Sequence, residues 1–241
     1  MEIHKPKPWH GVRELLKEYA IIVLGVLTAL SAEAVVERLH ENRLSAEARE
    51  SVRGEINLDL AGAGQRDEWQ PCIGARFAEI DAALAAADAG KPFRPMAYIG
   101  RPSAFALYNQ RWEAATSGGR TSLLSSDEQR DFARVYAQLL ILAERQDQET
   151  QAWARLRALE GVAHPSAETL ARAREALSEA RQADYNIRRA MLGVRAYAAR
   201  LGIKGDAKLV DFNHRTASVC VPTTTPREAV AALTKDAIGA P

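Results

Sequence analysis

The chain has 241 residues, a formal net charge of +1 and a charged fraction of 26%. This balance excludes a strongly basic nucleic-acid-binding protein, and it is typical of a folded chain rather than a disordered one. Alanine, leucine, arginine and glutamate are abundant, whereas aromatic residues make up only 6%. The composition therefore predicts an all-α protein.

The longest apolar run, residues 19–36, predicts a membrane-spanning helix. It follows residues 1–18, which we expect to form a short tail and the interfacial start of the same helix. Eighteen helical residues extend roughly 27 Å, close to the ~30 Å thickness of a bilayer's hydrocarbon core. Glu33 is the only charged residue of the run. It lies near one end, where its carboxylate can reach headgroups or water.

Two other interpretations of this run remain open. A cleavable signal peptide would have the same basic start, the same apolar core and a processing site such as Ala32-Glu33-Ala34. A buried helix of a soluble protein would have a similar length and hydropathy. The anchor is favoured because the helical period continues without a break through Val36, Leu39 and Leu44.

Small residues form a stripe on one face of the predicted membrane helix. Gly25, Ala29 and Ala32 follow one another at helical spacing, and Glu33 lies four residues after Ala29. Such a surface allows a second helix to approach closely, and an intramembrane carboxylate is a functional candidate. The alternatives are that small residues are simply common in membrane helices and that Glu33 is an interfacial charge.

After the span, the pattern predicts a juxtamembrane helix over residues 37–71 and a helical bundle over residues 72–241. Pro71 is expected to break the helix, so that a second helix runs from Cys72 to Ala89. Residues 90–102 contain three prolines and are expected to form an irregular loop. Ser103 is then expected to cap a short helix that ends near Thr116.

A long antiparallel hairpin is predicted over residues 126–201. Ser125 and Glu128 have the spacing of a capping box, and the helix after them is expected to run to Glu160. Ser166 caps the second helix, and the short connection between the two helices makes them antiparallel neighbours. A short C-terminal helix is expected from Thr225 to about residue 236.

The heptad pattern of this hairpin places three polar residues, Gln146, Glu149 and Asp184, on its buried seam. Buried carboxylates need partners. The basic side chains nearest in sequence that could supply them are Arg145, Arg181 and Arg188. This set is interpreted as a polar layer that fixes helix register; a small ligand pocket and an incorrect heptad assignment are the alternatives.

The two cysteines, Cys72 and Cys220, are candidates for a disulfide; two unrelated buried thiols are the alternative. Basic residues are almost equally numerous on the two sides of the span. The signal-like N-terminus and the cysteine pair favour a single-pass protein of the bacterial inner membrane, with a cytoplasmic N-terminus and a periplasmic domain.

Motifs for chemistry are missing from the sequence. The five histidines form no H-E-x-x-H or comparable metal-binding set, and neither a phosphate-binding loop nor a G-x-S-x-G elbow occurs. We therefore expect no catalytic, cofactor-binding or metal-binding residues, and the protein is predicted not to be an enzyme.

Two segments, 18–30 (EYAIIVLGVLTAL) and 112–118 (WEAATSG), carry a resemblance to a family. With them the chain resembles a group of uncharacterised bacterial single-pass membrane proteins that begin with a similar anchor and continue as a long helix. The resemblance implies a membrane-anchored helical protein and no established activity.

Two functional hypotheses follow from these patterns. The first is an anchored helical protein that acts through protein contacts, as a homo-oligomer or as an accessory subunit of a membrane complex, with membrane lipid as its surroundings. The second is a periplasmic ligand-sensing bundle that signals through a partner. No nucleic acid and no cofactor is expected in either case.

Overall fold

The computed structural model describes residues 11–206 and 218–230. These residues form helices and connecting segments without any strand, which confirms the all-α prediction. The α-helices are α1 (Val12–Asp88), α2 (Gln110–Ser117), α3 (Ser126–Leu156) and α4 (Ala167–Arg200). Short 3-10 helices are η1 (Arg120–Leu123), η2 (Arg157–Leu159) and η5 (Ser218–Cys220).

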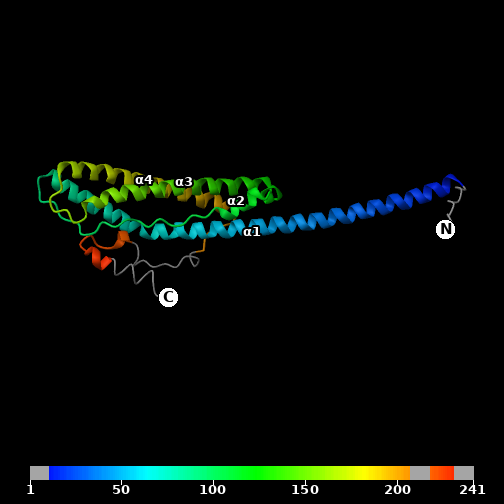
Figure 1. The fold of residues 1–241 in the computed structure, drawn as a ribbon, viewed down its shortest axis with the longest axis horizontal. Coiled ribbons are helices and arrows are strands. Elements are labelled where there is room, and N and C mark those ends of the chain that lie inside the picture. Colours follow the sequence, from blue (N-terminus) through cyan, green and yellow to red (C-terminus); the bar gives the residue numbers. More distant parts are fainter. Residues whose placement is uncertain (1–10, 207–217, 231–241) are drawn as a thin grey trace, which may run out of the picture.

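The N-terminal part of α1 stands alone as a rod, whereas its C-terminal part belongs to the bundle (Figure 1). Every residue from 12 to 43 is exposed except Val23, which is half-buried, and the first buried residue is Ser45. The free part of the helix is therefore about 48 Å long. It contains the whole apolar run of residues 19–36.

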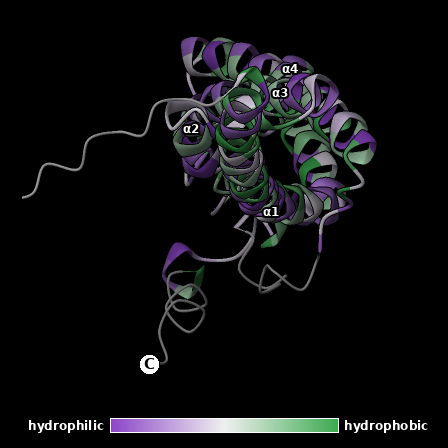
Figure 2. Ribbon diagram, turned by 90° about the vertical axis from the view of Figure 1, so that its right-hand side faces the viewer, coloured by the Kyte–Doolittle hydropathy of each residue, from purple (hydrophilic) through white to green (hydrophobic). Residues whose placement is uncertain are grey.

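The bundle packs α3 and α4 side by side, with the C-terminal part of α1 lying along both (Figure 1). Hydrophobic residues lie mainly on the inner sides of these helices and hydrophilic ones on the outer sides (Figure 2). One core cluster lies toward the anchor and includes Ile56, Phe132 and Met191. A second lies toward the far end, where Phe77 stacks on Trp153 with ring centroids 5.2 Å apart.

The expected break at Pro71 is wrong, because α1 continues through this residue to Asp88. Proline lacks the N–H that would bond the carbonyl of Asp67, but Pro71 is exposed, so water can solvate that carbonyl. Trp69 and Ile73 are buried on either side and keep the helix packed on the hairpin. The last part of α1 departs from the line of its first part (Figure 1), as expected for a helix that contains proline.

The hairpin helices begin at the predicted caps. The Ser125 hydroxyl accepts the N–H of Glu128, whose carboxylate bonds back to the N–H of Ser125. Ser166 caps α4 by accepting the N–H of Thr169. The first helix is shorter than expected, because α3 ends at Leu156 and a 3-10 turn, η2, replaces its last residues.

Glu128 also ties the hairpin to the base of the free rod. Its two carboxylate oxygens accept hydrogen bonds from Arg49 of α1 at 2.6 and 3.1 Å. These bonds from Arg49, aided by those from Ser125, lower the pKa of Glu128 to about 2. The carboxylate stays ionised over the physiological range, so the start of α3 stays bound to α1.

The short helix predicted from Ser103 is wrong at its start, since α2 begins only at Gln110. The residues before it are irregular, and side chains of α1 and α3 take their backbone N–H groups. Gln146 accepts the N–H of Phe105 at 2.9 Å, and Asp59 accepts that of Tyr108 at 2.9 Å. These bonds compete with the helical pattern and hold the segment extended.

The segment 218–230 is fastened to the far half of α1. Cys72 and Cys220 form a disulfide with a Cα–Cα distance of 4.9 Å. Arg76 donates to the carbonyl of Val221. Gly100 has φ +69° and lies so close to Ser218 that any side chain there would collide with its carbonyl group. Residues 227–230 are helical, and the rest of the predicted C-terminal helix lies outside the described residues.

We expect reduction of the disulfide, or the double substitution Cys72→Ala/Cys220→Ala, to destabilise the bundle by about 2–5 kcal/mol. The bond connects residues 148 apart in sequence and so restricts the unfolded chain. For a domain of this size the midpoint of thermal unfolding should fall by about 5–15 °C. Circular dichroism with and without reductant measures this. Adding reductant to the double variant is the control; a further fall in that sample would contradict the assignment.

Candidate functional site

The most strongly constrained polar group in the bundle is Arg66, which lies on the buried face of α1 and is 1% exposed. Its guanidinium donates to both oxygens of Glu149 of α3, at 2.6 and 2.7 Å. It also donates to Asp184 of α4 at 2.7 Å. One cation thus joins three helices through charge-assisted bonds that fix both height and rotation.

Two further side chains complete this layer. Gln70 donates to both oxygens of Asp184, the shorter bond being 3.0 Å, and Arg188 donates to the same carboxylate at 3.1 Å. The second arginine balances the second carboxylate, so the layer holds two positive and two negative charges. Burial raises the pKa of Glu149 against the opposing effect of Arg66.

The structure buries all three residues of the predicted polar layer: Gln146, Glu149 and Asp184 are 6%, 4% and 3% exposed. They do not act as one group. Glu149 and Asp184 share Arg66, whereas Gln146 bonds the backbone N–H and carbonyl of Phe105, so it holds the irregular segment.

The expected arginine partners are correct in one case of three. Arg188 bonds Asp184, but Arg181 pairs with Asp81 of α1 at 3.3 Å, and Arg145 bonds Gln148 on its own helix. The principal partner, Arg66, was missed. A signal for it exists, because Arg66 follows Ile56 and Ala63 on the buried stripe of α1, within the predicted helix 37–71. Its partners gave no such signal, since they lie on other helices.

A second buried polar layer lies about three turns closer to the free rod, and the sequence reasoning did not find it. Glu55 accepts the N–H groups of Arg111 and Trp112 at 2.9 and 3.3 Å. It therefore caps α2 from another helix. The hydroxyl of Tyr136 donates to the same carboxylate at 2.7 Å.

The four residues predicted as a membrane-helix contact, Gly25, Ala29, Ala32 and Glu33, are all exposed on the free rod. An added Cβ at Gly25 would meet nothing within 4 Å. The rod is one candidate membrane span near the N-terminus, by length and hydropathy, and its apolar window is 0% buried. The disulfide in the bundle suggests an extracytoplasmic domain.

Two hydroxyl groups in the middle of the span, those of Thr28 and Ser31, are satisfied within the helix. Thr28 and Ser31 each donate to the backbone carbonyl four residues earlier, at 2.7 Å. The helix also satisfies its own backbone groups along the span, which is the condition for entering hydrocarbon.

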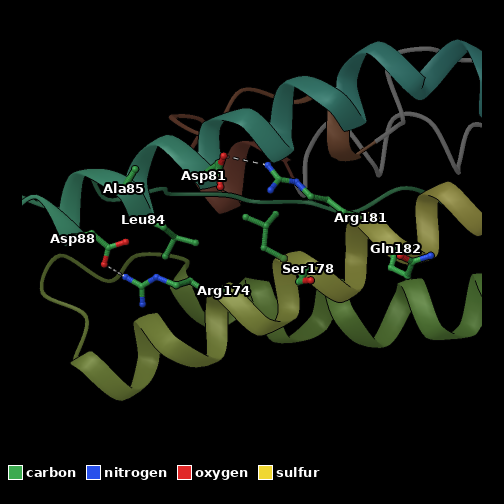
Figure 3. A pocket seen from close by; sticks show the side chains of 9 residues that line it. Asp81, Leu84, Ala85, Asp88, Arg174, Ser178, Arg181 and Gln182 are labelled. Carbon is green, nitrogen blue, oxygen red and sulfur yellow. Dashed lines mark hydrogen bonds and ion pairs between the residues drawn. The ribbon is translucent and has the colours of Figure 1, made fainter.

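Grooves on the bundle are bounded by ion pairs. One of about 450 Å³ lies between the end of α1 and α4 (Figure 3). Arg174 pairs with Asp88 and Arg181 with Asp81 across it. These charges neutralise one another, so the groove offers helix-pairing contacts and no reactive group.

In the part of the chain that the structure describes, no group of three or more His, Cys, Asp or Glu side chains could hold a metal ion. Comparison of the chain with protein-family models, with curated proteins and with solved structures finds no match.

We expect Arg66→Met to destabilise the protein by about 3–5 kcal/mol, because it leaves Glu149 and Asp184 buried without their shared cation. Urea unfolding followed by circular dichroism measures the loss. Arg172→Met, which removes an exposed pair with Glu168, is the matched control and should cost no more than about 0.5 kcal/mol. Equal effects of the two substitutions would contradict the role given to Arg66.

Proposed function

We propose that this chain is a membrane-anchored helical protein that acts through protein–protein contacts, as a homo-oligomer or as an accessory subunit of a membrane complex. One observation carries the proposal. The free apolar rod and the part of α1 that packs in the bundle are a single continuous helix. In water the exposed apolar surface of such a rod would promote aggregation.

The exposure of the rod supports insertion into a bilayer. Ile21, Leu24 and Val36 are 71%, 69% and 66% exposed, and their neighbours in the span are similar. Each large aliphatic side chain favours insertion by about 0.3–0.6 kcal/mol. Several together outweigh the single carboxylate of Glu33, which lies near one end of the span.

Continuity of α1 supports a retained anchor over a cleaved leader. The candidate processing site at Ala32-Glu33-Ala34 lies within a continuous helix, about three turns before the first buried residue, Ser45. A buried core helix is disfavoured because nothing in the bundle covers the span. The disulfide supports a periplasmic bundle and a cytoplasmic N-terminus in a bacterial inner membrane.

The contact surface we propose is the small-residue face of the span, formed by Gly25, Ala29, Ala32 and Glu33. All four remain accessible on the rod, and in lipid the close approach of small residues is a principal source of helix association. Association of the spans then also fixes the position of the bundle, because α1 is continuous between the two. A ligand-sensing role for the bundle stays an untested alternative.

We expect Gly25→Leu to dissociate the complex, because a leucine there holds a partner helix away from the stripe. The size of the native particle in mild detergent, measured by light scattering, should fall from an oligomer or partner complex to a monomer. Ala34→Leu is the matched control, since it adds the same side chain to the opposite face of the same helix and should leave the particle unchanged.

Two results would contradict the proposal. The first is an unmodified chain that is strictly monomeric and purifies without any partner. The second is an equal response of the particle to both leucine substitutions.

A further inference from the structure

One buried carboxylate next to the second polar layer, that of Asp59, plays no part in the proposed function. Asp59 of α1 is 1% exposed. Its Oδ1 accepts the N–H of Tyr108 at 2.9 Å. Its Oδ2 is buried and has no hydrogen-bond partner among the described residues. An ionised carboxylate with one oxygen buried and unpaired is costly, so this group favours the protonated state.

The groups that face Asp59 do not supply a compensating charge. On α1 the carboxylate of Glu55 lies one turn earlier and repels it. On α3 the neutral hydroxyl of Tyr136 is committed to Glu55, and on α2 Arg111 presents its backbone N–H to Glu55. Two basic side chains of the neighbouring helices bond other groups: Arg195 of α4 donates to Asp67 and to the carbonyl of Ala63, and the guanidinium of Arg111 donates to Ser51.

Titration of Asp59 follows from this environment. Burial raises its pKa to about 7, against the effect of the Tyr108 N–H, and Glu55 raises it further. The carboxylate in an unfolded or open chain has a pKa of about 3.9. Because the closed-state pKa is the higher one, the stabilisation is full below about pH 4 and is lost as pH rises through 7.

The segment that covers Asp59 is held on the bundle by a few polar contacts and two aromatic side chains. Residues 101–117, which we name the strap, are irregular up to α2 and bind the bundle mainly through Gln146, Asp59 and Glu55. Phe105 of the strap packs on Gly62, where an added Cβ would lie 2.9 Å from its ring. Trp112 stacks on Tyr136 with ring centroids 5.1 Å apart.

We propose that the strap is a pH-sensitive cover of the bundle, closed when Asp59 carries a proton and released as Asp59 ionises. Lifting the strap lets water reach the Asp59 carboxylate, which relieves the cost of its charge. Lifting the strap also exposes the apolar surface of α1 on which Phe105 packs and the ring of Tyr136. This device goes beyond the proposed function, and it stands or falls independently of the membrane anchor.

The test is amide hydrogen exchange of the full chain in detergent micelles, at pH 6 and at pH 8.5. Peptides covering 103–112 are compared between the unmodified protein and Asp59→Asn, whose amide cannot ionise. Comparing two proteins at the same pH removes the intrinsic pH dependence of exchange. The ratio of strap exchange rates, unmodified protein over Asp59→Asn, should rise about tenfold between pH 6 and pH 8.5, since the opening equilibrium gains up to tenfold for each pH unit between the open-state pKa of about 3.9 and the closed-state pKa of about 7. At pH 6 the strap of the unmodified protein should already exchange faster than that of Asp59→Asn, because the open chain holds Asp59 ionised at that pH.

Peptides of α3 over 139–156 serve as the internal reference and should show the same protection in both proteins. Glu50→Gln is the control variant, because it removes an exposed carboxylate of α1 and should leave the strap unchanged at both pH values. A strap that exchanges equally fast in the two proteins at pH 8.5 would overturn the proposal, as would a ratio that is the same at both pH values.

If Asp59→Asn does not fold, the unmodified protein alone decides. The protection of the strap relative to α3, corrected for intrinsic rates, should fall by about tenfold between pH 6 and pH 8.5. A constant relative protection over that range would then refute the pH-sensitive cover.

Discussion

The rest of the structure depends on the continuity of α1 from Val12 to Asp88. This one helix is apolar on all sides over residues 19–36 and becomes one-sided after Ser45, where it meets the hairpin. The same rod therefore serves as a candidate anchor and as a wall of the core. Because an α-helix resists bending, the depth at which the rod is held determines the height and orientation of the bundle.

Polar bonds then fix the hairpin on this rod. Arg49 holds the start of α3 near the anchor, and Arg66 joins all three helices in the middle. The disulfide between Cys72 and Cys220 joins the segment 218–230 to the far half of α1. The apolar contacts between these points supply most of the burial, but they do not distinguish one register from the next. The charged contacts do, because a carboxylate shifted by one turn would be buried without its partner.

Local signals explain which features the sequence could predict. Ser125, Glu128 and Ser166 form caps whose partners lie three residues away, and Gly161 and Gly202 adopt the positive φ angles that end helices. The all-α class, the hairpin and the apolar rod follow from such short-range patterns. The burial of Gln146, Glu149 and Asp184 also follows, because heptad spacing determines which face of a hairpin helix is covered.

Long-range contacts explain what the sequence did not reveal. Pro71 is tolerated because its exposed position lets water reach the free carbonyl, which no local rule specifies. The start of α2 was misplaced because its cap is Glu55, more than fifty residues earlier in the chain. Arg66 and Asp59 were missed because the groups they bond lie on other helices or in the irregular segment before α2, far away in the sequence.

The central claim is that the membrane rod and the bundle wall are one rigid helix. The direct measurement is the distance between spin labels at Glu37→Cys and Gln65→Cys in full-length protein in lipid nanodiscs. The described chain has no free cysteine, so labels attach only at the introduced sites. A continuous helix predicts one narrow distribution centred at about 42 Å. A broad distribution, or one centred at a much shorter distance, would mean a hinge between membrane and bundle and would contradict the account.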